Sequence, residues 1–273
     1  MTALTQSIAL GPMVLSLNQL LIGLALSMAL LTSTLVGSRR GESASDTLFN
    51  TLLIGIVAAR LVFVTRYHAD YASVWAMFDI RDGGFDTLGG VVAGSAYVCW
   101  RLWRAPRQRV VLASAVLTGA LAWSVAAGSL LLIDNQVRSL PKTQLATLDH
   151  RPITLTALAE RADQPMVVNL WATWCPPCRR EMPILAAAQR ARDDITFVFV
   201  NQGEYAARVK QYLKNESLEL SHVWLDPGQA LGRAVGSQAM PTTLFYDADG
   251  RLRDSHLGAL SRASLSAKLE QLY

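Results

Sequence analysis

The apolar and polar positions divide the chain into two stretches with different patterns. Residues 1–139 contain long apolar runs with few charges, whereas residues 140–273 alternate short apolar runs with polar segments. Apolar runs of about 20 residues are long enough to cross a bilayer, and short runs rich in β-branched residues are typical of buried strands. We therefore predict an α-helical membrane domain over 1–139 and an α/β domain over 140–273.

Four apolar segments in the first stretch predict membrane-spanning helices. They are residues 8–36, 47–64, 85–103 and 110–133. A cleaved signal peptide is the alternative for the first segment, but no basic residue precedes Arg39, where a signal peptide would carry its basic region. Gly and Ala residues in the third segment permit close packing of helices. Residues 65–84 are polar and aromatic and predict a loop.

Arginine residues predict the orientation of these spans. Every basic residue of 1–139 is an arginine, and most lie between apolar segments. The first loop contains Arg39 and Arg40, and the third loop contains Arg101, Arg104, Arg107 and Arg109. Loops rich in arginine tend to face the cytoplasm, so the chain after about residue 134 is expected on the outer side. Lys and Arg exceed Asp and Glu by 25 to 21, which these membrane flanks explain. The sequence has no nucleic-acid-binding motif, and we expect no nucleic-acid partner.

Arg60 lies inside the second predicted span, where a charge costs at least about 2.5–3.5 kcal/mol unless it is paired or functional. Asp82 and Asp86 are candidate partners. The alternative is that Arg60 extends its charge to the membrane interface. Binding of a phospholipid at this position is a further hypothesis.

The strongest chemical signal is the segment from Trp174 to Cys178, Trp-Cys-Pro-Pro-Cys, which joins a predicted strand at 166–171 to a helical pattern. Cys175 stands at the start of that helix, where unpaired N–H groups and the positive end of the dipole stabilise a thiolate. Its pKa should therefore be depressed. Cys178 follows one turn later, within reach of a reversible disulfide. The pair predicts thiol–disulfide exchange.

Other uses of a Cys-x-x-Cys pair are a zinc site or an inert structural disulfide. A zinc site needs two further ligands, and the four histidines have no ligand spacing relative to the pair. We expect neither a metal nor a cofactor. The third cysteine, Cys99, lies in an apolar segment, where we expect a small buried side chain. One cysteine cannot relay electrons across a membrane by itself, so a separate membrane electron donor is expected.

Residues from about 140 to 273 resemble thioredoxin-fold proteins of the TlpA/ResA type, which are membrane-tethered thiol–disulfide oxidoreductases of bacterial envelopes. The segments that carry the resemblance are residues 174–183, 199–204 and 240–251. The resemblance implies a thioredoxin-like fold, a cis proline at Pro241 beside the cysteines, and an acid–base role for Glu181. Asn169 stands where many thioredoxins have a buried aspartate, and Glu181 would replace that group.

The residue type and the resemblance together give a set of candidate site residues. The candidate catalytic residues are Cys175, Cys178, Glu181 and Pro241, and the candidate substrate-binding residues are Trp174, Met240 and Thr242. A cis bond before Pro241 would leave the backbone of Met240 free to pair with an extended substrate segment.

The first stretch is similar, over about residues 10–105, to the N-terminal part of prolipoprotein diacylglyceryl transferase. The segments that carry this similarity are residues 10–12, 55–64 and 82–90. That family has a histidine where this chain has Leu88, and its downstream Arg-Asn signature is absent. We therefore expect a truncated relative that contacts membrane lipids without transferase chemistry.

These observations predict a multi-pass protein of the bacterial cytoplasmic (inner) membrane whose redox domain lies on the periplasmic side. Its expected function is to reduce disulfides of envelope proteins. A periplasmic oxidase or isomerase, a lipid-binding membrane protein with a regulatory redox domain, and a binding module with a vestigial cysteine pair are the alternatives.

Overall fold

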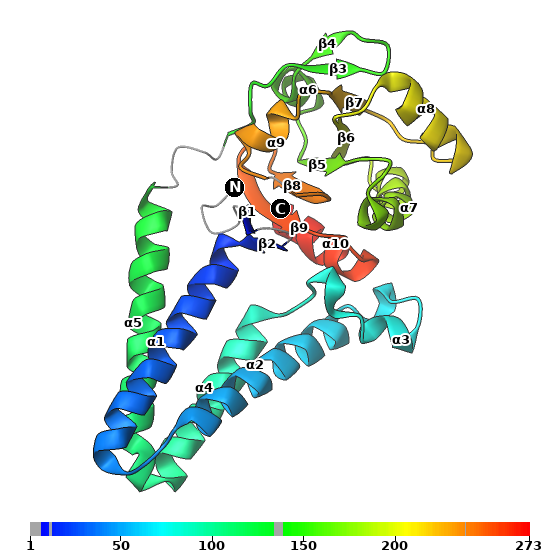
Figure 1. Cartoon of the computed structure of the whole chain (residues 1–273). Helices are drawn as coiled ribbons and strands as arrows, with labels where there is room; N and C mark the ends of the chain where they lie inside the picture. The colour runs from blue at the N-terminus through cyan, green and yellow to red at the C-terminus, as the bar shows by residue number, and fades with distance from the viewer. Residues whose placement is uncertain (1–6, 11–12, 134–138, 238) are drawn as a thin grey trace. The chain divides into compact units, whose positions relative to one another are not determined.

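The structure is a computed structural model that describes residues 7–10, 13–133, 139–237 and 239–273 (Figure 1). The chain forms two compact units. The α/β unit comprises Met1–Leu17, Arg81–Gly83 and Ile133–Tyr273, and the helical unit comprises Asn18–Ile80 and Gly84–Leu132. Each unit is described by itself.

Four long helices build the helical unit. They are α1 (Leu17–Arg40), α2 (Ser45–Arg66), α4 (Thr87–Arg104) and α5 (Arg109–Ile133). The segment between α2 and α4 contains the short elements η2 (His68–Asp70), α3 (Val74–Met77) and η3 (Ile80–Asp82), and η4 (Pro106–Gln108) precedes α5. The predicted loop at 65–84 is therefore partly helical.

Three helical segments of the described chain are long and apolar enough to cross a membrane, namely Gln19–Arg40, Ser45–Arg66 and Pro106–Gly128. The fourth expected span, α4, forms a helix but is not among them. It has 18 residues, and Arg101 and Arg104 occupy its last turn. The expectation of four spans thus becomes three candidate spans and one less apolar helix.

The first predicted span begins later than expected. Residues 7–16 carry an antiparallel strand pair, β1 (Ser7–Leu10) and β2 (Met13–Ser16), and the helix starts at Leu17. The prediction of a helix from residue 8 was wrong for this segment. Residues 11 and 12 lie outside the described residues, but their sequence is Gly-Pro, a pair that favours turns and interrupts helices.

Glycines bring α2 and α4 into close contact. A Cβ atom on Gly90 would lie 2.9 Å from the carbonyl oxygen of Gly55, and one on Gly55 would lie 3.3 Å from the carbonyl of Gly90. Only glycine leaves room for this approach of two backbones. The predicted close packing through small residues is confirmed.

A seven-stranded sheet forms the centre of the α/β unit, with the strand order β4-β3-β7-β6-β5-β8-β9. The strands are β3 (Leu145–Thr147), β4 (Pro152–Ile153), β5 (Met166–Trp171), β6 (Thr196–Gln202), β7 (Val223–Asp226), β8 (Thr242–Tyr246) and β9 (Leu252–Leu257). β5, β6 and β7 are parallel, β8 pairs antiparallel with β5, and β9 pairs antiparallel with β8 at the edge of the sheet. This is the thioredoxin-like arrangement that the sequence predicted.

Helices cover both faces of this sheet and enclose two apolar cores (Figure 1). α7 (Pro176–Ala191), α8 (Ala206–Asn215) and α10 (Arg262–Leu269), which ends in η6 (Glu270–Leu272), contribute to the first core. α6 (Leu155–Ala162) and α9 (Ala230–Ala234) contribute to the second core.

The central strand β5 is buried on both faces, which explains its continuous apolar sequence. Val167 and Trp171 point into the first core, while Val168 and Leu170 point into the second. Both cysteines of the motif also belong to the first core. The alternation of side chains along β5 therefore defines a cysteine face and an opposite face of the sheet.

Candidate active site

Cys175 and Cys178 form a disulfide with an S–S distance of 2.06 Å at the start of α7. Cys175 is the N-cap residue, and the backbone N–H of Cys178 donates a hydrogen bond to its sulfur at 3.3 Å. Pro176 and Pro177 occupy the first helical positions, where a missing N–H costs nothing. When the disulfide opens, the helix N-terminus stabilises a thiolate on Cys175.

Glu181 lies one turn after Cys178 on α7, and its side chain is fully buried. Its Oε1 accepts a hydrogen bond from Asn169 Nδ2 at 2.8 Å, and its Oε2 accepts one from the Leu260 N–H at 2.9 Å. Burial raises the pKa of Glu181 to about 7, against the opposing effect of these two hydrogen bonds. The carboxyl group can therefore take up or release a proton near neutral pH.

Asn169 connects Glu181 to the sheet. Its Nδ2 also donates to Thr243 Oγ1 at 3.0 Å, and Thr243 is its neighbour in the β5–β8 register. The sequence analysis expected Glu181 to replace the aspartate that Asn169 substitutes, and the structure brings the two side chains into direct contact. The catalytic role of Glu181 stays a prediction.

The peptide bond between Met240 and Pro241 is cis, as the sequence predicted. Met240 is half-buried and packs against the core that contains both cysteines. Trp174, directly before Cys175, is 59% exposed and offers an apolar surface beside the disulfide. The roles of Met240 and Trp174 as substrate contacts stay predictions.

Thr242 has a different environment from the other two expected substrate contacts. Its side chain is fully buried. Its hydroxyl donates to the Ala239 carbonyl at 2.8 Å and lies 2.7 Å from Ser237 Oγ. These contacts hold the segment before the cis bond, so Thr242 acts on that segment rather than through an exposed side chain.

A second buried glutamate, which the sequence analysis did not assign, holds the loop before Cys175. Both the N–H and the hydroxyl of Thr173 donate to the carboxylate of Glu204, at 2.7 and 2.6 Å. Asn201 Nδ2 donates to it at 2.8 Å, and Arg208 Nε lies 3.0 Å from Oε1. Residues 199–204 were part of the family resemblance, and that was the only signal for this role.

The net electrostatic effect on Glu204 is the reverse of that on Glu181. Burial alone would raise the pKa of Glu204, but the hydrogen bonds from Thr173 and Asn201 outweigh it and lower the pKa. Glu204 is therefore a carboxylate at neutral pH. It fixes the backbone that leads into the cysteine motif.

In the helical unit, Arg60 binds backbone carbonyl groups. Its guanidinium donates to the carbonyls of Met77, Asp79 and Gly84 at distances between 2.7 and 3.2 Å. Asp86, one expected partner, instead accepts a hydrogen bond from the Gly89 N–H and caps α4. Arg60 thus holds the segment between α2 and α4, a role that the sequence analysis did not foresee.

An apolar cavity of about 750 Å³ lies beside α2 and α4 in the same unit. Gly55, Val91 and Cys99 are among the residues that line it. Cys99 is exposed, so the prediction of a buried cysteine was wrong. Its segment is apolar, as predicted, but Cys99 faces this cavity rather than a packed helix.

Comparisons with known proteins agree with the two-part pattern. The family model described as Redoxin matches residues 136–272. The family model described as prolipoprotein diacylglyceryl transferase matches residues 7–130. The first match covers half of the chain, and it contains the disulfide, Glu181 and the cis bond before Pro241.

Individual relatives match the same C-terminal region. The chain is 32% identical over 136 residues to the thiol:disulfide interchange protein DsbE of Pseudomonas fluorescens biotype C, which is 48% of this chain and 74% of that protein. It is 27% identical over 117 residues to the thioredoxin-like protein YneN of Bacillus subtilis (strain 168), 42% of this chain and 69% of that protein.

A third relative is the thiol:disulfide interchange protein HelX of Rhodobacter capsulatus, which is 29% identical over 106 residues, 39% of this chain and 59% of that protein. The chain therefore spans between about three fifths and three quarters of the length of these curated relatives. The matched region carries the cysteine pair, and the chain belongs to the Redoxin family as a thiol–disulfide oxidoreductase with a thioredoxin-like fold.

Proposed function

We propose that this protein reduces disulfides of envelope proteins at the periplasmic face of the inner membrane, with Cys175 as the attacking and Cys178 as the resolving cysteine. The observation that carries the proposal is the Cys175–Cys178 disulfide at the start of α7, one turn before a buried glutamate. The pKa of that glutamate, Glu181, is raised to about 7.

The reaction begins with both cysteines reduced. The Cys175 thiolate attacks one sulfur of the client disulfide, a mixed disulfide forms, and the other client sulfur leaves as a thiolate that takes up a proton. Cys178 then loses its proton and attacks the Cys175 sulfur, which releases the reduced client. Glu181, one turn from Cys178, accepts that proton. A dithiol donor in the membrane returns two electrons to the oxidised pair.

The client approaches as an extended segment at Met240. A peptide that pairs with the Met240 backbone adds a strand beside the cis bond, and its disulfide-bonded cysteine then faces Cys175. Trp174 offers an exposed aromatic surface next to the reacting sulfur. Main-chain pairing of this kind accepts different client sequences, since backbone groups are common to all of them.

Three candidate spans and the positions of arginine residues support the membrane placement. The α1–α2 connection at Ala44 packs against Val111 and Leu112 at the start of α5, so the two arginine-rich connections lie at one end of the helical unit. α5 has 25 residues and thus a length of about 37 Å, enough to cross a bilayer core of about 30 Å. Arginine-rich connections face the cytoplasm, so the end of α5 reaches the periplasmic side.

Trapping of the mixed disulfide tests the exchange reaction. A Cys178→Ser variant cannot resolve the intermediate, so it should accumulate client proteins that a reductant releases. Cys99→Ser is the matched control and should behave as wild type, while Cys175→Ser should trap nothing. Trapping that depends on Cys99 instead of Cys175 would contradict the proposal.

The orientation of the redox half in the membrane and the direction of its exchange reaction need two further measurements. In a Cys99→Ser background, Lys142→Cys should react with a membrane-impermeant maleimide on intact cells. Labelling only after permeabilisation would place the redox half in the cytoplasm. Equilibration of the pair with glutathione gives its potential, and a strongly oxidising value would favour the oxidase or isomerase alternative.

Lipid contact by the helical unit is a second candidate function. The apolar cavity of about 750 Å³ and the transferase family match support it. Leu88 replaces the family's histidine, so we propose binding without transfer. Ser95→Phe would fill the cavity and should reduce the amount of phospholipid retained on purification, measured by mass spectrometry. Ser27→Phe, an exposed residue of α1 that does not line the cavity, is the control.

A further inference from the structure

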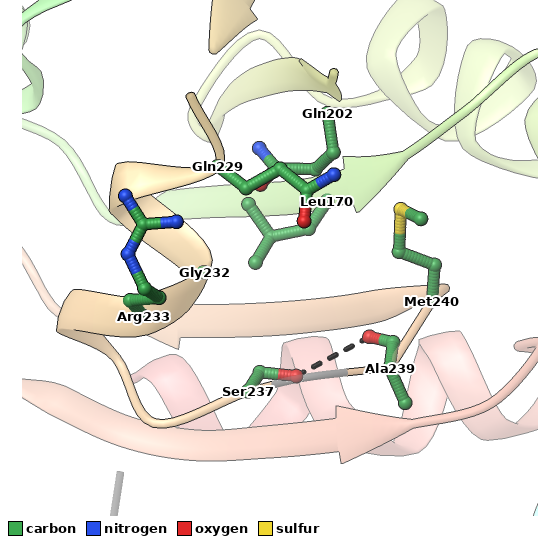
Figure 2. A pocket seen from close by; sticks show the side chains of 8 residues that line it. All are labelled: Leu170, Gln202, Gln229, Gly232, Arg233, Ser237, Ala239 and Met240. Atoms are coloured by element: carbon green, nitrogen blue, oxygen red, sulfur yellow. Dashed lines mark hydrogen bonds between the residues drawn. The ribbon is translucent and has the colours of Figure 1, made fainter. Parts of the chain in front are cut away.

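A polar cavity of about 320 Å³ opens beside Met240, and nothing in the exchange reaction uses it (Figure 2). Leu170, Gln202, Gln229, Arg233 and Met240 are among its lining residues. Its volume lies at the lower end of the range of ligand pockets, about 300–1,000 Å³. The cavity therefore suits one side chain or a small group better than a large cofactor.

The polar groups of the cavity favour a negatively charged group. Arg233 is exposed, and the described residues provide its guanidinium with neither an ion pair nor a hydrogen bond. Gln229 likewise keeps its side-chain amide free of hydrogen bonds to described residues. Gln202 is only 4% exposed, and its Nε2, which donates weakly to the Val200 carbonyl at 3.5 Å, has a second N–H. Among the residues that line the cavity, none is acidic. An arginine with adjacent amide donors is the usual protein arrangement for binding a carboxylate.

The side chains in Figure 2 span the cavity from the guanidinium of Arg233 to Met240, which precedes the cis proline. Arg233 lies at one end, Met240 at the other, and the two glutamine side chains lie between them. Met240 also packs against the core that contains Cys175 and Cys178. The cavity is thus adjacent to the position where a client segment would pair with the backbone.

The cavity lies on the sheet face opposite the cysteines. Leu170, which lines it, belongs to the second core, whereas the cysteines belong to the first. Successive side chains of an extended segment point to opposite faces. If the client cysteine points toward Cys175, the residues directly before and after it point toward the cavity, and those two positions away do not.

We propose that this cavity is a specificity subsite for an acidic side chain directly adjacent to the reacting cysteine of the client. The inference rests on the proposed disulfide reduction and adds the class of client sequence. Arg233 holds the carboxylate, and the amides of Gln202 and Gln229 complete its coordination. Clients with such a residue are reduced faster than otherwise identical clients.

Matched synthetic peptides test the subsite. Each short peptide has blocked ends and one cysteine, joined by a disulfide to 2-mercaptoethanol, so that the only carboxylate is the one under test. Cys175 attacks the peptide sulfur and 2-mercaptoethanol leaves as a thiol; Cys178 then releases the reduced peptide and the pair becomes oxidised. The series places Glu before the cysteine, Glu after it, Gln at the same positions, or Glu two positions away.

The 273-residue chain, reduced and held in lipid nanodiscs, should reduce a peptide with adjacent Glu about tenfold faster in kcat/KM than its Gln counterpart. Arg233→Glu should remove this preference, and Arg233→Lys should keep part of it. Arg190→Glu has the same change of charge at an exposed position in the last turn of α7, and it should leave the preference intact.

The outcomes separate this inference from the proposed function. Reduction of all peptides at similar rates would overturn the subsite and leave disulfide reduction standing. An equal response to Glu two positions away, or an equal effect of Arg190→Glu, would show a general charge effect and also overturn it. No exchange with any peptide would contradict the proposed function and the subsite together.

Discussion

Two buried glutamates adjoin the cysteine motif, and their pKa values are shifted in opposite directions. Glu181 lies one turn after Cys178, and burial raises its pKa to about 7. Glu204 holds the loop before Cys175, and its pKa is lowered. Both side chains are at most 7% exposed. Burial by itself therefore does not decide whether a carboxyl group in this site titrates near neutral pH.

The number and kind of donors explain the difference. Glu204 accepts three hydrogen bonds from Thr173 and Asn201 and has the cation of Arg208 at 3.0 Å. Glu181 accepts two hydrogen bonds from neutral donors, from Asn169 and the Leu260 backbone. More donors and a cation favour the charged form enough to overcome desolvation. One glutamate is thus an anchor, and the other is available to exchange a proton.

Removal of the anchor should have the largest effect. Glu204→Leu leaves the Thr173 N–H, the Thr173 hydroxyl and the Asn201 amide without their acceptor, so the free energy of unfolding should fall by about 4 kcal/mol. Denaturant unfolding followed by tryptophan fluorescence measures this. The control Glu219→Leu changes an exposed glutamate and should stay within about 0.5 kcal/mol. Equal losses would show that Glu204 is not an anchor.

The two glutamates should change stability with pH in opposite directions. Glu181 has a folded pKa of about 7 against 4.5 for the free group, so its contribution is full below pH 4.5 and is lost as the pH rises to about 7. The loss amounts to at most about 3 kcal/mol. Glu204 has a lowered folded pKa, so its contribution is present above pH 4.5 and is lost as the pH falls.

Unfolding midpoints of the oxidised protein between pH 4 and pH 8 check these signs. Relative to wild type, Glu181→Gln should gain stability as the pH rises through 7. Glu204→Gln should lose most at pH 8 and least at pH 4. If the unfolding midpoints of the two variants changed with pH in the same direction relative to wild type, the assignment of opposite roles would be contradicted.

Proton transfer should depend on Glu181 alone. Glu181→Gln removes the titrating group and should slow disulfide reduction at neutral pH by about 100-fold, within the usual range for a general base. The inflection near pH 7 in kcat/KM should disappear with it. Glu219→Gln is the matched control and should keep both the rate and the inflection. An unchanged pH profile in the Glu181 variant would assign the inflection to another group.

The cation beside Glu204 should matter least. Arg208 is 68% exposed, and solvent screens ion pairs of this kind. Arg208→Gln should therefore cost less than about 1 kcal/mol of unfolding free energy. A loss as large as that of Glu204→Leu would show that the cation, and not the hydrogen bonds, sets the charge of Glu204.

Local sequence patterns predicted much of the fold. β5 has the predicted bounds at 166–171, because an apolar run acts over a few neighbouring positions. The start of α1 was missed because the mostly apolar residues 8–16 extend its pattern into a strand pair. Hydropathy alone does not distinguish a strand from a helix there.

The site was predicted where its chemistry is local and missed where it depends on distant contacts. The Cys175–Cys178 pair lies within one helical turn. The cis bond before Pro241 was expected from the family resemblance of residues 240–251. Thr173 and Glu204 are 31 residues apart, and no sequence pattern paired them. Asn169 and Glu181 are 12 apart; the resemblance linked their roles but did not predict the hydrogen bond between them. Only the folded sheet brings these pairs together.

The sequence by itself determined which two sulfur atoms form the disulfide, where their helix begins and that the chain divides into an apolar helical half and an α/β half, because each follows from neighbouring residues. The tertiary structure decided which buried glutamate holds a proton near neutral pH and where a polar cavity opens beside Met240. The two glutamate pKa values and the lining of the cavity depend on side chains that come from separate elements. The pKa of a carboxyl group depends on every donor and charge that folding places around it.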